Sequence, residues 1–219
     1  MPTKFDKREY RRIEVSGMET RKAEDGAMIV EGYATTFNQP YQLWSDKDYT
    51  ANEQVDRHAF DETDMSDVIM QYDHEGRVFA RVGNGTLELE TDEHGLKIRA
   101  NLGGTEIGRQ LFEEIQGGYT NKMSFGFTVK EDRREETVTQ DHITVLRTIT
   151  KIGKLYDVSA VSLPANDATE ISARTISDGL IAEVLEEVKA AEERRAKEER
   201  RSAALEKLNN LIKEVQPHE

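Results

Sequence analysis

The chain changes character near residue 178, and this change limits the folds that it can adopt. Between Tyr10 and Leu163, apolar residues occur in short runs, mostly alternating with polar ones, and residues typical of turns separate these runs. Alternation with a period of two is typical of strands that bury one face, and glycine or aspartate is typical of the connections between strands. This part of the chain is therefore predicted to be a mostly antiparallel β domain.

One segment in this region has the pattern of a helix instead. Ile107, Leu111 and Ile115 are spaced four residues apart, so they would share one face of a helix. Thr105 is placed to cap its N-terminus, and Gly117 is placed to end it. Many short strands with one intervening helix predict a closed or nearly closed β-barrel. The expected fold class is therefore α+β, mainly an antiparallel β-barrel with surrounding helices.

Turn residues also predict which strands pair. Residues 28–34 are expected to pair with 13–15, residues 87–89 with 96–98, and residues 143–152 with 155–163 across Gly153. The second pair is joined by a loop that ends in glycine, which tolerates the positive φ that tight hairpins need.

The segment after residue 178 has no proline up to Gln216 and only one glycine, Gly179, so it favours a long charged helix. Its middle is nearly all charged residues and alanine, and pairs such as Glu193–Lys197 would stabilise a solvated helix. Two apolar stripes flank this middle: Ile181, Val184, Leu185 and Val188, then Leu205, Leu208, Ile212 and Val215. These stripes leave open a second interpretation, in which they dock on partner helices.

The predicted organisation has three parts. Residues 1–9 form a flexible N-terminus, residues 10–177 form the barrel domain, and residues 178–219 form the charged helical tail.

Composition excludes several functions. The formal net charge of −13 argues against binding nucleic acid, which requires a basic face. The absence of cysteine excludes disulfides, thiolate nucleophiles and cysteine-ligated zinc. No apolar run approaches the ~20 residues that a membrane helix needs, and the start of the chain lacks the apolar region of a signal peptide. We therefore expect a soluble, intracellular protein that binds neither nucleic acid nor membrane.

Three residues have the chemistry of a hydrolytic site. His74 follows an apolar strand, so its ring can lie at the rim of the core and serve as a base. Ser124 lies in an apolar strand on the same face as Gly126, which leaves room for a substrate backbone. Asp157 lies in another apolar strand, where a carboxylate is costly unless it is paired. A nucleophile, a base and an acid can come from distant parts of a chain, because geometry defines a catalytic triad.

Each of these residues also has a structural interpretation. Most lone histidines are structural, and a serine on the less apolar face of a strand is usually exposed to solvent. Ser159 lies on the same face as Asp157 and is a rival partner for its carboxylate. Asp73 and Glu75 flank His74 and are rival acids. No metal motif or phosphate-binding loop is present, so neither a metal nor a cofactor is expected.

The order of the motifs resembles that of the prohead (capsid maturation) proteases of HK97-type tailed phages. The matching segments are residues 31–38, 72–74, 123–127 and 157–161 with 164–165, within a stretch from Glu31 to Arg174. The resemblance implies a serine endopeptidase related in fold to the herpesvirus assembly proteases. It implies His74 as the base, Ser124 as the nucleophile and Asp157 as the acid, a position where this family often has glutamate.

The resemblance also implies a biological setting, namely the immature phage capsid (prohead) in the host cytoplasm. The expected partners are the major capsid protein and its scaffolding segment, the portal and other internal prohead proteins, and further copies of the enzyme. The helical tail would be a docking element, a self-cleaved segment or both. A non-enzymatic scaffold or capsid-binding protein on the same barrel is the main alternative, and a hydrolase of small esters is a further one.

Overall fold

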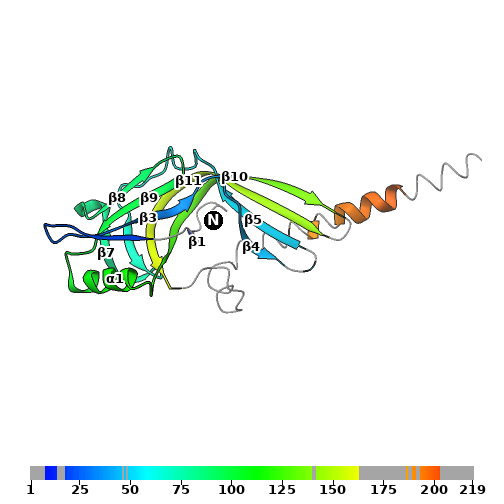
Figure 1. The fold of residues 1–219 in the computed structure, drawn as a ribbon. Coiled ribbons are helices and arrows are strands. Elements are labelled where there is room, and N and C mark those ends of the chain that lie inside the picture. The colour runs from blue at the N-terminus through cyan, green and yellow to red at the C-terminus, as the bar shows by residue number, and fades with distance from the viewer. Residues whose placement is uncertain are drawn as a thin grey trace, which may run out of the picture. The chain divides into compact units, whose positions relative to one another are not determined.

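The protein is described by a computed structural model, which places residues 8–13, 18–45, 47, 49–139, 142–162, 186, 189–190 and 193–202. The chain divides into two compact units, Met1–Ile176 and Ser177–Glu219. The first unit is mostly β-sheet, with few helices (Figure 1).

The larger sheet has seven strands and contains the two longest strands of the described chain. Its strands are β1 (Arg8–Ile13), β4 (Tyr41–Ser45), β5 (Tyr49–Val55), β6 (Ile69–Tyr72), β7 (Glu75–Arg81), β10 (Lys122–Val138) and β11 (Ile143–Val161). Strands β10 and β11 pair antiparallel along almost their whole length. Strand β11 also pairs in parallel with β5 along its first half and with β6 near its end. Strand β1 lies at the edge and pairs with β10.

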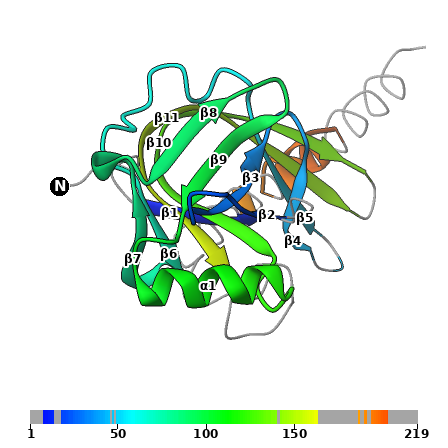
Figure 2. The same ribbon diagram turned by 60° about the vertical axis from the view of Figure 1, so that its left-hand side comes forward.

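The smaller sheet has four antiparallel strands in the order β2, β3, β9, β8. These strands are β2 (Glu19–Lys22), β3 (Met28–Thr36), β8 (Leu87–Thr91) and β9 (Gly95–Asn101). Helix α1 (Glu106–Gln116) follows β9, and it lies below both sheets in Figure 2. Apolar side chains from the two sheets and the helix form one core, which includes Val30, Ile98, Phe112, Phe125 and Leu155.

The predicted elements that depend on residues close to one another in the sequence are confirmed. Strands β8 and β9 form the expected hairpin. Helix α1 begins at the expected cap, where the Thr105 side chain accepts a hydrogen bond from the backbone N–H of Gly108. Leu111 and Ile115 are buried on its inner face, and the helix ends at Gly117. Both signals depend on neighbours within a few residues.

The barrel prediction is wrong for the described part of the chain, which forms two sheets. A barrel requires an unbroken ring of paired strands. Here the outer strands of the larger sheet, β1 and β4, do not pair with the outer strands of the smaller sheet, β2 and β8. The two sheets share a core without closing on each other.

Two of the predicted pairings are also wrong. Strand β11 continues through Gly153, because β10 is long enough to pair with it on both sides of this glycine. Strand β3 pairs with β2 and β9, whereas β1, which includes Arg8, Glu9 and Ile13, pairs with β10. A polar N-terminal segment thus belongs to the larger sheet.

In the second unit the described residues, 186, 189–190 and 193–202, are helical. The two apolar stripes predicted for the tail lie outside the described residues, and a continuous long helix is not shown. Among the described helices, none has the length and apolar character needed to cross a lipid bilayer.

Candidate active site

Ser124 lies near the start of β10, between the core residues Met123 and Phe125. It is fully buried, whereas the sequence suggested an exposed face. The reason is its position between two strands, since it pairs with Arg12 of β1 on one side and with Ser159 of β11 on the other. The edge strand β1 therefore covers the nucleophile candidate.

Asp157 lies on β11 directly opposite Gly126 of β10, and its side chain is fully buried. A Cβ atom on Gly126 would lie 2.3 Å from Asp157 Oδ2 and 2.8 Å from a ring carbon of Tyr10. Gly126 is thus required for the carboxylate and the tyrosine ring to fit. The sequence had suggested instead that a substrate backbone would use this space.

His74 lies in the tight turn between β6 and β7. Its φ is 62° and that of Asp73 is 48°, so both central residues of the turn have left-handed backbone. This pattern suits a two-residue hairpin turn, and Asp73 tolerates it better than most side chains. The Asp73 carboxylate accepts hydrogen bonds from the backbone N–H and hydroxyl of Ser162, which fixes the turn to the end of β11.

The three predicted site residues lie within hydrogen-bonding distance of one another. His74 Nδ1 is 2.5 Å from Asp157 Oδ1, and His74 Nε2 is 2.5 Å from Ser124 Oγ. Ser159 donates a further hydrogen bond of 3.0 Å to Asp157 Oδ1, so both predicted partners of this carboxylate are present. The imidazole thus connects the hydroxyl to the carboxylate, which is the arrangement that nucleophilic catalysis by serine requires.

Two residues of β1 complete the surroundings of the imidazole. The Tyr10 ring lies against the His74 ring, with 4.5 Å between their centroids. Arg8 Nη2 lies 3.6 Å from Asp157 Oδ2, an oxygen that has no hydrogen-bond partner among the described residues. Neither residue was predicted from the sequence, because β1 was expected to be flexible or to pair elsewhere.

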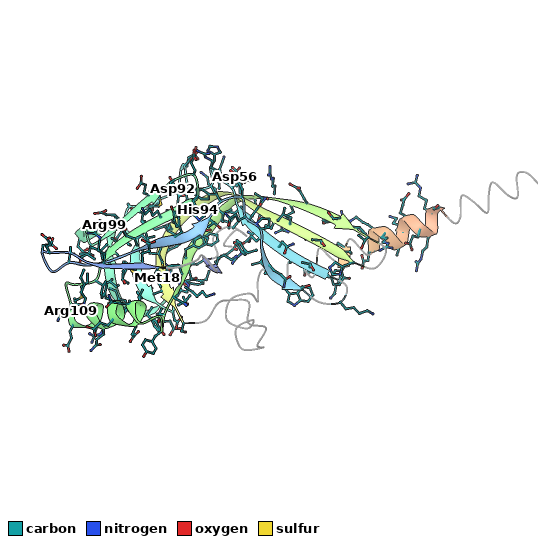
Figure 3. The ribbon with its side chains drawn as sticks, in the orientation of Figure 1. Met18, Asp56, Asp92, His94, Arg99 and Arg109 are labelled. Carbon is teal, nitrogen blue, oxygen red and sulfur yellow. The ribbon has the colours of Figure 1, made fainter. Side chains whose placement is uncertain are left out.

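The other histidines in the described chain lie away from Ser124. His58 contacts Asp61, and His142 contacts Thr50. His94 lies in the loop between β8 and β9 and packs edge-on against Tyr33; Figure 3 shows it beside Asp92. The described residues contain no group of three or more side chains suited to a metal ion.

A second polar cluster spans β1, β4, β5, β10 and β11, and it was not predicted. We call it the charge cluster, and it consists of Glu9, Arg11, Tyr41, Glu53, Asp132 and Arg147. Glu53 is fully buried and both of its oxygens contact Arg11. Arg147 Nη1 donates to Glu53 at 2.9 Å, and the Tyr41 hydroxyl donates to it at 2.5 Å.

The charge cluster favours the charged form of Glu9 and the neutral form of Tyr41. Burial alone would raise the pKa of Glu9, but the adjacent guanidinium groups of Arg11 and Arg147 lower it to about 2. Burial and the neighbouring Glu53 carboxylate raise the pKa of Tyr41 well above its ordinary value, which keeps its hydroxyl protonated.

Comparison with known proteins places the chain among phage proteins. A family model described as caudovirus prohead serine protease matches residues 16–181. Among solved structures, the capsid assembly protease of bacteriophage T4 is similar with a TM-score of 0.42 and 12% identity, over 70% of this chain and 96% of that one. No curated protein matches the chain significantly.

Proposed function

The chain belongs to the caudovirus prohead serine protease family, as the resemblance in its sequence predicted, and on this premise we propose that it is a serine endopeptidase acting through Ser124, His74 and Asp157. The observation that supports this proposal most is the position of the His74 ring, whose two nitrogens lie 2.5 Å from the serine and aspartate oxygens. No other histidine in the described chain is placed in this way.

In the proposed mechanism, Ser124 Oγ attacks the carbonyl carbon of the bond to be cleaved while His74 Nε2 takes its proton. Asp157 accepts the hydrogen bond from His74 Nδ1, selects the tautomer whose Nε2 is free and stabilises the imidazolium that forms. Ser159 donates to the same carboxylate oxygen and holds it in place. His74 then gives its proton to the leaving amine, and water hydrolyses the acyl-enzyme by the same route.

The proposed substrates follow from the family. In a prohead they are the major capsid protein with its scaffolding segment, other internal proteins such as the portal, and the enzyme itself. The proposed place of action is the immature capsid in the host cytoplasm. Residues 178–219 are proposed to dock the enzyme on its partners or to be removed by self-cleavage.

The alternative is a non-enzymatic scaffold built on the same fold, and the full burial of Ser124 favours it over a hydrolase of small esters. A fluorophosphonate probe separates enzyme from scaffold, because it forms a covalent bond only with an activated serine. The matched control is Ser124→Ala in the same chain. Labelling of the wild-type chain but not of the variant is expected, and a chain that stays unlabelled would support the scaffold.

The substrate is tested by co-expression with the major capsid protein of the same phage, followed by mass spectrometry of the products. We expect the wild-type chain to shorten the capsid protein, and Ser124→Ala to leave it intact. Labelling without cleavage of any capsid protein would contradict the assignment as a maturation protease while keeping the enzyme assignment.

A further inference from the structure

Strand β1 is an unusual part of the larger sheet. It begins and ends before residue 16, so it lies outside the segment that matches the family model. Among the described strands it pairs with β10 alone, and none of the others would cover the edge of β10 that carries Ser124 if β1 were absent. An open edge of this kind can bind an extended peptide as an added strand, through backbone hydrogen bonds and pockets for alternate side chains.

The backbone of β1 places a carbonyl group at the nucleophile. The Ser124 hydroxyl lies 2.8 Å from the carbonyl oxygen of Arg11 and 2.5 Å from His74 Nε2. A hydroxyl has one proton, so it cannot donate to both acceptors at once. While the hydroxyl donates to the Arg11 carbonyl, its proton is not directed to His74. With β1 in this position, Ser124 is therefore not activated as a nucleophile.

The side chain of Arg11 enters a buried acidic pocket. Its guanidinium group contacts both oxygens of Glu53, and it lies 5.7 Å from the centre of the Phe127 ring. Glu53 does not depend on this contact for its pairing, because Arg147 and Tyr41 also donate to it. The pocket therefore offers two carboxylate oxygens that match a guanidinium, and Glu53 keeps Arg147 and Tyr41 as partners when Arg11 leaves.

Successive side chains of β1 lie on opposite faces of the sheet, as those of an extended bound peptide would. Arg11 pairs with Phe125 and enters the pocket, whereas Tyr10 pairs with Gly126 and covers the His74 ring on the opposite face. Strand β1 thus presents a carbonyl to the nucleophile, one side chain to a pocket and the next to the imidazole.

We propose that β1 occupies the substrate-binding groove of the enzyme, and that this groove takes peptide segments with an arginine immediately before the cleaved bond, selected by Glu53. The proposal rests on the serine protease function given above. Ser124 reacts only while β1 is out of the groove, so the chain alone reacts slowly, during transient opening, and a substrate or a partner that displaces β1 makes it react faster.

The reaction on such a segment balances without a cofactor. The Ser124 oxygen bonds to the carbonyl carbon of the arginine, and the serine proton passes to His74 Nε2. The C–N bond to the next residue breaks as His74 gives this proton to the leaving nitrogen. Water then cleaves the ester, which leaves a new carboxylate on the arginine and a free serine hydroxyl.

The first test asks whether β1 blocks the nucleophile. Arg11→Ala in the full chain removes the side chain that anchors β1, so labelling of Ser124 by a fluorophosphonate should be faster by about tenfold or more, given the charge-assisted hydrogen bonds lost. Arg11→Lys should give a smaller increase, because it keeps the charge but not the fork. The matched control is Arg99→Ala in the smaller sheet, where Arg99 forms partly exposed ion pairs with Glu31 and Glu88, and it should leave the rate unchanged.

Three results would overturn this part of the inference. Labelling of folded Arg11→Ala at or below the wild-type rate would show that β1 does not block Ser124. An equal increase for Arg99→Ala would show a general loosening of the protein. Loss of the fold by Arg11→Ala, seen by circular dichroism, would show that Arg11 is a structural part of the core.

The second test addresses selection by Glu53. A synthetic peptide with the sequence of residues 5–16 is incubated with the Arg11→Ala chain, and its products are identified by mass spectrometry. We expect cleavage between the residues equivalent to Arg11 and Arg12, and kcat/KM at least about tenfold lower when glutamate replaces the arginine equivalent to Arg11. This difference should shrink when Glu53→Gln is added to the enzyme.

The outcomes separate this inference from the proposed function. Labelling of Ser124 together with cleavage elsewhere, or with no preference for arginine, would overturn the inference and leave the protease assignment standing. Absence of both labelling and cleavage in every variant would overturn the proposed function itself.

Discussion

Two polar clusters are buried in the larger sheet, and they differ in how completely they are paired. In the charge cluster, the two oxygens of Glu53 receive four hydrogen bonds from Arg11, Tyr41 and Arg147. At the candidate triad, Asp157 is equally buried, but its Oδ2 has no hydrogen-bond partner within the described residues. The nearest cation, Arg8, is 3.6 Å away.

This difference indicates that one buried carboxylate, Glu53, stabilises the fold and the other, Asp157, serves the proposed catalysis. A fully paired buried network contributes to a unique fold, because each of its charges is stable in the interior only while its partners are in place. An incompletely paired carboxylate costs free energy in the resting protein and can interact more strongly when a positive charge forms beside it. We therefore expect changes in the charge cluster to reduce stability, and changes at Asp157 to reduce turnover.

The largest expected effect is that of Asp157→Asn. An asparagine can donate to His74 Nδ1 and favour the wrong tautomer, so kcat for capsid-protein cleavage should fall by ~10³ to 10⁴, as in other serine proteases with this change. The melting temperature should stay close to that of the wild type. A decrease of less than about tenfold in kcat would remove Asp157 from the mechanism.

The next effect is that of Glu53→Gln, which conserves shape and removes one charge. Because Arg11 and Arg147 then lose the charge of a shared partner in a buried site, the free energy of unfolding should fall by about 3 to 5 kcal/mol. Urea titration followed by circular dichroism measures it. The control is Asp67→Asn, which alters the exposed ion pair with Arg81 and should cost less than about 1 kcal/mol.

Gly126→Ala tests how closely the triad is packed. The added methyl group would overlap Asp157 Oδ2 and displace the carboxylate from His74, so kcat should fall by about 10²-fold. The free energy of unfolding should fall by about 1 to 3 kcal/mol through overpacking. Gly104→Ala is the control, because no atom lies within 4 Å of its added Cβ. Wild-type turnover by the Gly126 variant would show that the carboxylate position is not critical.

The smallest expected effect is the pH dependence contributed by Glu9. Its pKa is lowered from 4.5 to about 2 in the folded protein, so its contribution to stability is complete above its unfolded value and is lost as pH falls toward about 2. Glu9→Gln should therefore lower the free energy of unfolding by about 1 to 3 kcal/mol near pH 7 and have little effect near pH 2. An equal loss at both pH values would show that the charge of Glu9 is not the cause.

Short-range signals in the sequence were sufficient for some elements and not for others. The cap at Thr105 and the hairpin around Gly95 were predicted because the residues that form them are close in sequence. The pairing of β1 with β10 was missed, because a short polar segment has no pattern that identifies a partner more than a hundred residues away.

The site was predictable in part. Chemistry and resemblance selected His74, Ser124 and Asp157, and the structure brings these residues together. The burial of Ser124 was not predictable, since it depends on β1. The charge cluster was missed for a related reason. Glutamate and arginine are usually exposed, and only the fold shows that Glu53 and Arg147 are buried.

The parallel pairing of β6 with β11 has a consequence for how an active enzyme arises. Ser124 and Asp157 lie on adjacent antiparallel strands. His74 lies in a separate hairpin, and it is 83 residues away from Asp157 in the sequence. Pairing between distant segments closes a long loop and forms slowly, so local antiparallel contacts have a kinetic advantage. We therefore expect the base to reach its position late in folding, which gives a newly made chain an interval without peptidase activity.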